Sequence, residues 1–298
     1  MTKSYSRGRP PAVEQLSFDV ADGETVGFVG LNGAGKTTTI KVAAGVLLPT
    51  SGTVIIDGHD IVRDKVNASM ASGWVPEFPN FDMGVRASSL MKYYAGFYKM
   101  GGTTDQRCAE MFKAVGLGGA EDKKLREYSQ GMKKRFMLGV SLLSDPHNLL
   151  FDEVLNGLDP EGIAYFRQLV IDYKKKGKAV LFSSHLLSEV EALADKIVVI
   201  HKGKVVKIIG RNDLAVVGGE SLRVVMDRVD QRAVEYLKTL GEVTVDGNRV
   251  AVKGFSGDPG GVSTQLAKMG YSVSEFARVN ESLEDYFFRL IGMEGGKA

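Results

Sequence analysis

The feature that most constrains the fold of this 298-residue chain is the stretch 24–46, which begins "ETVGFVGLNGAGKTTTI". Residues 24–30 form a short apolar run that predicts a buried strand. A glycine-rich turn follows, and then a helix that we expect from about Lys36 to Val46, ending near Pro49. A strand that leads through such a turn into a helix is typical of an α/β fold whose turn binds phosphate.

The turn has the residue types that phosphate binding needs. "GLNGAGKT" satisfies the pattern G-x-x-x-x-G-K-[ST] at Gly30, Gly35, Lys36 and Thr37. The glycines let backbone N–H groups converge on phosphate oxygens, Lys36 supplies a positive charge, and the Thr37 hydroxyl can ligate Mg²⁺. A chain with 36 glycines can match this pattern by chance, but the position between a strand and a helix favours a functional loop.

Two adjacent carboxylates follow another apolar strand. The stretch "NLLFDE" ends in Asp152 and Glu153, whose side chains point in different directions because they are neighbours at a strand end. One carboxylate can hold the Mg²⁺ shell while the other reaches an attacking water. Either residue alone would more often be a cap or a surface residue, but the phosphate-binding loop favours the functional interpretation.

Short apolar strands alternate with helices along residues 1–218, which we expect to form the first domain. The strands in "NLLFDEV", "KAVLFSSH" and "KIVVIHKG" are nearly continuous in apolar residues and predict a mostly parallel sheet that is covered on both faces. Residues of about 78–147 are richer in helix signals and predict a helical insertion. Residues 219–298 predict a small α+β domain with a hairpin in "EVTVDGNRVAVKG" and a closing helix in "SLEDYFFRLIG".

Composition excludes several classes of protein. The chain has 38 basic and 36 acidic residues, a net charge of +2, which is not the electrostatic signature of a nucleic-acid binder. Its single cysteine, Cys108, rules out an internal disulfide and fits a reducing cytosol. No window of about 18 apolar residues occurs. We therefore expect any association with a membrane to go through a partner.

Four motifs together resemble a known family. "GLNGAGKTT", "YSQGM", "LLFDEVLNGLD" and "SSHLLSEVEAL" occur in the order and spacing of the ATP-binding cassette of ABC transporters, over about residues 4–215. The resemblance implies an α/β phosphate-loop NTPase fold of the ABC ATPase type. Such a fold has a parallel-sheet core, an antiparallel β subdomain and an α-helical subdomain, to which this chain would add its small C-terminal α+β domain.

The resemblance also implies roles for individual residues. Glu153 would polarise the attacking water, and His185 would contact the γ-phosphate, although a lone histidine after a strand is more often a satisfied polar group. Asp152 would bind Mg²⁺ together with Thr37. Tyr5 would stack on adenine, although an aromatic residue near an N-terminus more often packs or is disordered. The ATP-binding loop would comprise Gly30, Leu31, Asn32, Gly33, Ala34, Gly35, Lys36, Thr37 and Thr38.

A second anion site is implied at "YSQGM". A serine at a helix start, a glycine that permits close approach and the positive end of the helix favour an anion there. In the family, this signature motif contacts the ATP held by a second subunit, and Asp159 in "NGLD" matches the loop along the dimer seam. A plain helix cap would explain the serine but not the glycine. The residues, hereafter the signature residues, are Ser129, Gln130, Gly131 and Met132.

Two features depart from the family pattern. The loop that usually presents a glutamine reads "GWVPE", which puts Glu77 at the position that touches the metal shell and senses the membrane partner. This "PE" and the tail "SLEDYFF" resemble the branch that includes drug and polysaccharide exporters. Only four residues precede Tyr5, where relatives usually carry a full strand. We expect either an edge sheet that lacks this strand or a translation start further upstream.

The resemblance implies the ATPase subunit of an ABC export system. Two copies, or one copy and a second ATP-binding subunit, would hold ATP and Mg²⁺ between them and drive a separate transmembrane permease. The chain would then be cytoplasmic and peripheral to the cell membrane, without a direct nucleic-acid partner. The alternative is a soluble ABC-type ATPase that acts on nucleic acid or ribosomes. Such proteins tend to have two cassettes, a long coiled-coil arm or a basic face, which this sequence does not show.

Overall fold

The chain divides into two compact units, Met1–Ile209 and Gly210–Ala298. The predicted domain boundary, between residues 218 and 219, lies outside the residues that the structure describes. The computed structural model describes residues 1–6, 8–98, 100–211, 213, 220–255, 257–280 and 282–292.

A six-stranded sheet forms the centre of the first unit. Its strands lie in the order β4 (Ser72–Val75), β5 (Asn148–Phe151), β6 (Ala179–Ser183), β1 (Thr25–Val29), β7 (Lys196–His201) and β8 (Lys204–Gly210). The first five pair in parallel, as predicted. All residues of β1 and β6 are buried, as expected for strands covered on both faces.

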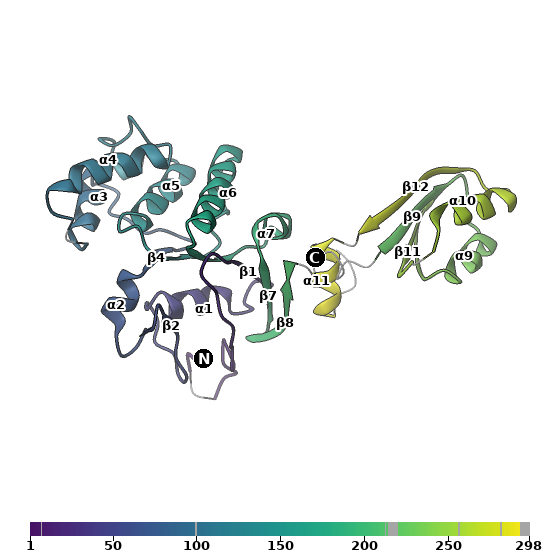
Figure 1. Ribbon diagram of the computed structural model, residues 1–298, viewed down its shortest axis with the longest axis horizontal. Helices are drawn as coiled ribbons and strands as arrows, with labels where there is room; N and C mark the ends of the chain where they lie inside the picture. Colours follow the sequence, from purple (N-terminus) through teal and green to yellow (C-terminus); the bar gives the residue numbers. More distant parts are fainter. Residues whose placement is uncertain are drawn as a thin grey trace. The chain divides into compact units, whose positions relative to one another are not determined.

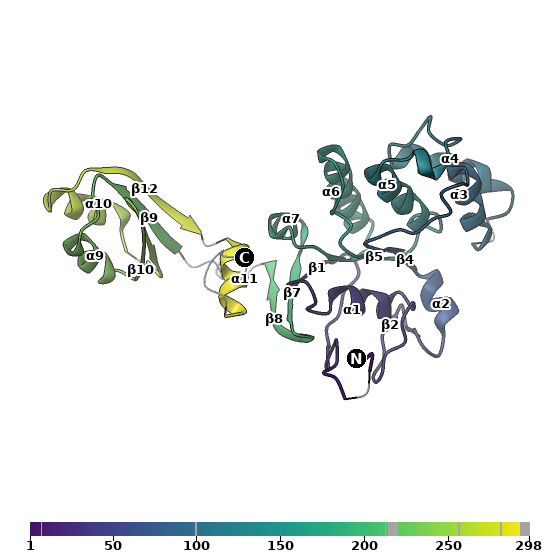
Figure 2. The same cartoon turned by 180° about the vertical axis from the view of Figure 1, so that it is seen from behind.

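Helices cover both faces of this sheet. Figures 1 and 2 show α1 (Lys36–Ala43) on one face, and α6 (Pro160–Lys175) and α7 (Leu187–Leu193) on the other. A small antiparallel hairpin of β2 (Ile55–Ile56) and β3 (His59–Asp60) precedes α2 (Lys65–Met70). The parallel-sheet α/β fold predicted from the sequence is therefore confirmed.

The helix-rich region lies between β4 and β5 in the sequence. Figure 1 shows its helices grouped together at one side of the first unit. The ring of Phe136 is fully buried and contacts Phe81 edge-on, with ring centroids 5.3 Å apart. This aromatic core joins the helices to the segment that follows β4. The helices are α3 (Ala87–Gly96), η1 (Gly101–Thr103), α4 (Thr104–Ala114), η2 (Leu125–Glu127) and α5 (Gln130–Ser141).

Helix α1 is shorter than predicted. It ends at Ala43 rather than near Val46, because Gly45 adopts a positive φ of 70°. The backbone N–H group of Gly45 donates to the carbonyl of Val42, and those of Val46 and Leu47 donate to the carbonyl of Lys41 at the helix end. Helices commonly end at a glycine in this left-handed conformation, which does not continue the helix.

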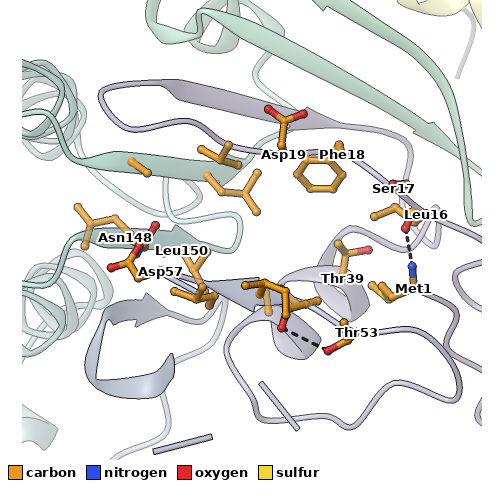
Figure 3. Close-up of a pocket in the computed structure, with 18 of the residues that line it drawn as sticks. Met1, Leu16, Ser17, Phe18, Asp19, Thr39, Thr53, Asp57, Asn148 and Leu150 are labelled. Atoms are coloured by element: carbon orange, nitrogen blue, oxygen red, sulfur yellow. Dashed lines mark hydrogen bonds between the residues drawn. The ribbon is translucent and has the colours of Figure 1, made fainter. Parts of the chain in front are cut away.

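A cavity of about 560 Å³ lies on the α1 side of the sheet (Figure 3). Its walls come from residues 16–20, residues 53–58, α1 and the strands β5 and β6. At one end, the amino group of Met1 donates to the carbonyl of Leu16 at 2.6 Å. Residues 1–6 make only two isolated bridges, at Thr2 and Lys3, and no strand. None of the candidate site residues lines this cavity.

The close approach of β4 to the end of α5 requires a glycine. A Cβ atom on Gly73 would lie 2.3 Å from the carbonyl oxygen of Ser141 and 2.8 Å from the ring of Pro146. We expect Gly73→Ala to lower the free energy of unfolding of the first unit by about 1–3 kcal/mol, because packed backbone must move apart. Urea unfolding followed by the fluorescence of Trp74, the single tryptophan, would measure this change.

A matched glycine provides the control. Gly96 ends α3, and an added Cβ there would meet nothing within 4 Å. Gly96→Ala should leave stability unchanged or raise it by up to about 1 kcal/mol, because alanine restricts the unfolded chain more than glycine does. Equal stability of the two variants would contradict the tight contact at Gly73.

The second unit is a four-stranded antiparallel sheet with two helices that pack on it. The elements follow in the order β9 (Glu220–Met226), α9 (Gln231–Lys238), β10 (Glu242–Asp246), β11 (Arg249–Lys253), α10 (Pro259–Lys268) and β12 (Val273–Asn280), before α11 (Leu283–Leu290). The spatial strand order β10-β11-β9-β12 makes this a ferredoxin-like βαββαβ arrangement. The hairpin predicted at the Asp-Gly turn is β10–β11. Among the described residues of the whole chain, no helix is both long and apolar enough to cross a membrane.

Candidate functional site

The glycine-rich loop connects β1 to α1 at the carboxyl end of the parallel sheet. Gly33 and Gly35 have φ values of 78° and 109°, which residues with a side chain rarely adopt. A Cβ on Gly35 would also lie 2.7 Å from the carbonyl oxygen of Ala12. The loop conformation therefore needs glycine at these positions, and α1 begins directly after it at Lys36. Backbone N–H groups at such a helix start favour an anion.

A cavity of about 370 Å³ opens over this loop. Besides Ala12 and all residues from Leu31 to Thr38 except Ala34, it is lined by Glu77, Glu153, Asn156 and His185. These residues come from the ends of β4, β5 and β6, which lie next to one another in the sheet. The structure thus brings together residues that are up to 173 positions apart in the sequence, from Ala12 to His185.

Lys36 is buried and its ammonium group has three oxygen neighbours. It donates to the carbonyl oxygens of Gly30 at 2.6 Å and Leu31 at 3.4 Å, and it lies 3.2 Å from Oε1 of Glu153. Both side chains of this ion pair are nearly inaccessible to solvent. The positive charge of the loop and the adjacent carboxylate therefore neutralise each other in this state.

Glu153 is held at several atoms. Nδ1 of His185 lies 3.0 Å from Oε2 of Glu153, and the amide group of Asn156 donates to the same oxygen at 3.3 Å. Its backbone has a φ of 47°, in the left-handed region that costs a non-glycine residue about 1–2 kcal/mol. Strained backbone of this kind is common at functional sites.

Asp152 is fully buried beside the loop. Its Oδ1 accepts hydrogen bonds from the hydroxyls of Thr37 and Ser183, both at 3.1 Å. Its Oδ2 is buried without a hydrogen-bond partner among the described residues. Burial raises the pKa of this carboxyl, and the two hydroxyl hydrogen bonds partly oppose the shift. An orphaned carboxylate oxygen next to a threonine hydroxyl is suited to a cation that completes its ligand shell elsewhere.

The signature residues lie outside this cavity. Ser129 is the N-cap of α5, and its hydroxyl accepts a hydrogen bond from the backbone N–H of Met132 at 3.2 Å. Ser129 and Gln130 are exposed, while Gly131 and Met132 are half-buried. The start of α5 thus faces solvent instead of the loop of its own chain.

The two remaining predicted residues also lie outside the cavity. Asp159 is the N-cap of α6 and accepts a hydrogen bond from Gly162 N–H at 2.9 Å, and its carboxylate lies 3.6 Å from Arg135 on α5. Tyr5 is exposed, and its hydroxyl lies 3.2 Å from the hydroxyl of Thr38 at the start of α1. Tyr5 is therefore near the loop, and its exposed ring has the ammonium group of Lys3 5.4 Å from its centroid.

Sequence reasoning missed two residues that contact the carboxylates. Ser183 accepts a hydrogen bond from the backbone N–H of Glu153 at 2.9 Å while it donates to Asp152, so one hydroxyl positions both acids. Asn156 contacts the Glu153 side chain directly. Both lie inside motifs quoted above, Ser183 in "SSH" and Asn156 in "LNGLD". The signal that could have identified Ser183 was a polar residue at the end of β6, the strand that pairs with β5.

This fold and this site define a phosphate-loop ATPase. The family model described as "ABC transporter" matches residues 13–156. Bacitracin transport ATP-binding protein BcrA of Bacillus licheniformis is 33% identical over 98% of this chain and 95% of its own length. Lantibiotic transport ATP-binding protein SrtF of Streptococcus pyogenes is 33% identical over 69% of this chain and 86% of its own.

A solved structure described as the ATP-binding subunit of an ABC transporter agrees with these matches. It is 27% identical, covers 72% of this chain and 88% of its own, and superposes with a TM-score of 0.66. The chain belongs to the family of ABC transporter ATP-binding subunits and is an ABC-type ATPase. The resemblance found in its motifs and the fold that this resemblance implied are therefore confirmed.

Proposed function

We propose that this chain hydrolyses ATP in composite sites formed by two ATP-binding subunits, and that hydrolysis drives export through a separate membrane permease. One observation carries the proposal: Ser129 and Gln130 are exposed at the start of α5, and none of the four signature residues lines the cavity over the loop of their own chain. An anion site of this kind, separated from the first, is explained if it contacts the nucleotide of a second subunit. Two identical chains can satisfy this requirement with a two-fold axis.

ATP phosphates would enter the cavity at Lys36. They would compete with Glu153 for the Lys36 ammonium, because a polyphosphate carries more negative charge than one carboxylate. Glu153 would then be free to act on a water molecule beside the γ-phosphate. The adenine ring would stack on the exposed ring of Tyr5, near the start of α1.

A divalent cation fits next to the phosphate-binding loop, at Thr37 and Asp152. The described residues contain no cluster of three His, Cys, Asp or Glu side chains that could hold a metal by themselves. Mg²⁺ commonly binds one or two protein oxygens together with substrate phosphates. Thr37 and Asp152 would supply these oxygens, with Glu77 lining the same depression as both. When bound, Mg²⁺ would neutralise charge on the phosphates during transfer.

The catalytic groups would be Glu153 and His185. Glu153 would orient the attacking water and accept its proton, and a ring N–H of His185 could donate to the γ-phosphate. Most of the reduction in the barrier to phosphoryl transfer comes from positioning and charge stabilisation. A site that is completed only when two subunits meet would therefore not hydrolyse ATP until they pair.

The permease would dock at an apolar depression next to Glu77. This depression is about 570 Å³ and is lined by Phe78, Phe81, Tyr94 and Met137, among others. Phe78 is 80% exposed although it is apolar. Thr37 and Asp152 line the same depression, so a partner seated there would reach the metal side of the ATP site. Permease docking would place the chain at the cytoplasmic face of the membrane.

Export is the direction that the sequence favours. The "GWVPE" segment and the tail "SLEDYFF" resemble the exporter branch of the family. Two relatives are named for the transport of bacitracin and of lantibiotics, and an export function of this chain would agree with these names. The second candidate, a soluble ABC-type ATPase acting on nucleic acid or ribosomes, has no comparable feature in its favour.

Isolation of the tagged chain from detergent-solubilised native membranes tests this proposal. We expect a membrane protein with several spanning segments to co-purify and to be lost at least tenfold with Phe78→Asp, because a charge would enter the docking depression. Val66→Asp is the matched control, since Val66 on α2 is also apolar and 73% exposed. Recovery of ribosomes or nucleic acid instead would overturn the proposal.

A further inference from the structure

A buried lysine on α5 takes no part in the roles described so far. Lys134 is 7% exposed and stands five positions after Ser129. Its ammonium group donates to the carbonyl oxygens of Glu153 at 3.1 Å and Val154 at 3.4 Å. A buried ammonium group is costly unless it is paired or hydrogen-bonded. Burial lowers the pKa of Lys134, and the neighbouring carboxylates of Glu77, Glu153 and Asp152 oppose this shift.

The carbonyls that Lys134 contacts belong to the turn that positions Glu153. This turn contains the left-handed backbone of Glu153, with a φ of 47°. Two other hydrogen bonds fix the turn: the Glu153 N–H donates to Ser183, and the Asn156 N–H donates to the Glu153 carbonyl at 3.2 Å. The first joins the turn to β6, and the second lies within the turn itself. Lys134 adds hydrogen bonds from α5 to the carbonyls of this turn.

Helix α5 connects this contact to the signature residues. Ser129 caps the helix, and Lys134 lies on its second turn, about 7.5 Å further along the axis. Backbone hydrogen bonds of an α-helix join residues four positions apart, so the positions of Ser129 and Lys134 along α5 are coupled. A ligand that holds the start of α5 would therefore also hold the Lys134 ammonium, and with it the Glu153 turn.

We propose that Lys134 is a positioning residue, which transmits occupancy of the signature residues by a partner's ATP to the catalytic carboxylate of Glu153 in the same chain. This inference rests on the proposed function, because it needs Glu153 to act on water and the signature residues to bind a second subunit's nucleotide. It explains why a charged side chain is buried in α5 and satisfied by two successive carbonyls of one strained turn.

Steady-state ATP turnover of Lys134→Met tests the inference. We expect kcat to fall at least tenfold while the KM for ATP·Mg stays within about threefold, because Lys134 contacts the Glu153 turn and no loop residue. Lys113→Met is the matched control, since Lys113 is an exposed lysine on α4, and its kcat should stay within twofold of wild type. Binding of a fluorescent ATP analogue verifies that each variant is folded.

A double-mutant cycle separates positioning from a general structural role. In the Glu153→Gln background, Lys134→Met should lower the single-turnover rate less than twofold, because the group that it positions no longer acts. If Lys134→Met does not bind the analogue, Lys134→Arg replaces it in the same cycle. We then expect the same fall in kcat for the single variant and the same small change in the Glu153→Gln background. A Lys134 variant with wild-type kcat, or effects that multiply in the double mutant, would overturn the inference. Absence of turnover by the wild-type chain in every assembly would instead overturn the proposed function.

Discussion

Replacing Glu153 with glutamine should lower ATP turnover by about 10²- to 10⁴-fold. The amide has almost the shape of the carboxylate but cannot accept the proton of the attacking water. ATP binding should persist and become tighter, because the buried ion pair with Lys36 disappears and leaves the ammonium group to the phosphates. Phosphate release measures the turnover, and gel filtration with light scattering measures the ATP-dependent dimer that the trapped nucleotide should stabilise.

The control for this variant is Glu191→Gln, another glutamate that is exposed on α7 and lies away from the cavity. Its turnover should stay within about twofold of wild type, as expected for a surface change. Normal turnover in Glu153→Gln would exclude Glu153 as the catalytic base. An ATP-bound variant that stays monomeric at every protein concentration would count against the composite site.

The parts of the fold that depend on local pattern could be predicted. The apolar run 24–30, the glycine turn and the following helix became β1, the loop and α1, because strand periodicity and glycine conformation are properties of adjacent residues. The exact end of α1 was wrong by three residues. It depends on the positive φ of Gly45, and a glycine in the sequence shows only that such a conformation is allowed.

The contacts that position the catalytic groups could be predicted only in part. Asp152 and Glu153 stood out because two carboxylates ended an apolar strand. Lys134 did not stand out, since its position in "MKKRF" resembles that of a solvated lysine on a helix face. Its burial depends on how α5 packs against the turn after β5, which brings together residues 19 positions apart. Tertiary packing of this kind leaves no periodic signal in a single sequence.

Mixing two inactive variants should restore activity if the sites are composite. Ser129→Arg places a bulky cation at the exposed start of α5, where a second subunit's nucleotide would bind. Lys36→Ala removes the positive charge from the loop. Each variant alone should turn over ATP at least about 100-fold more slowly than wild type, because every site in its homodimer lacks one of the two groups.

In an equal mixture, half of the dimers should contain one chain of each variant. One of the two sites in such a dimer combines the intact loop of the Ser129→Arg chain with the intact signature residues of the Lys36→Ala chain. Turnover should therefore return to about one quarter of the wild-type rate. The negative control mixes Ser129→Arg with the double variant Ser129→Arg/Lys36→Ala, which together form no intact site. If the first mixture were as inactive as this control, Ser129 would serve the nucleotide of its own chain, and the exposed start of α5 would need another ligand.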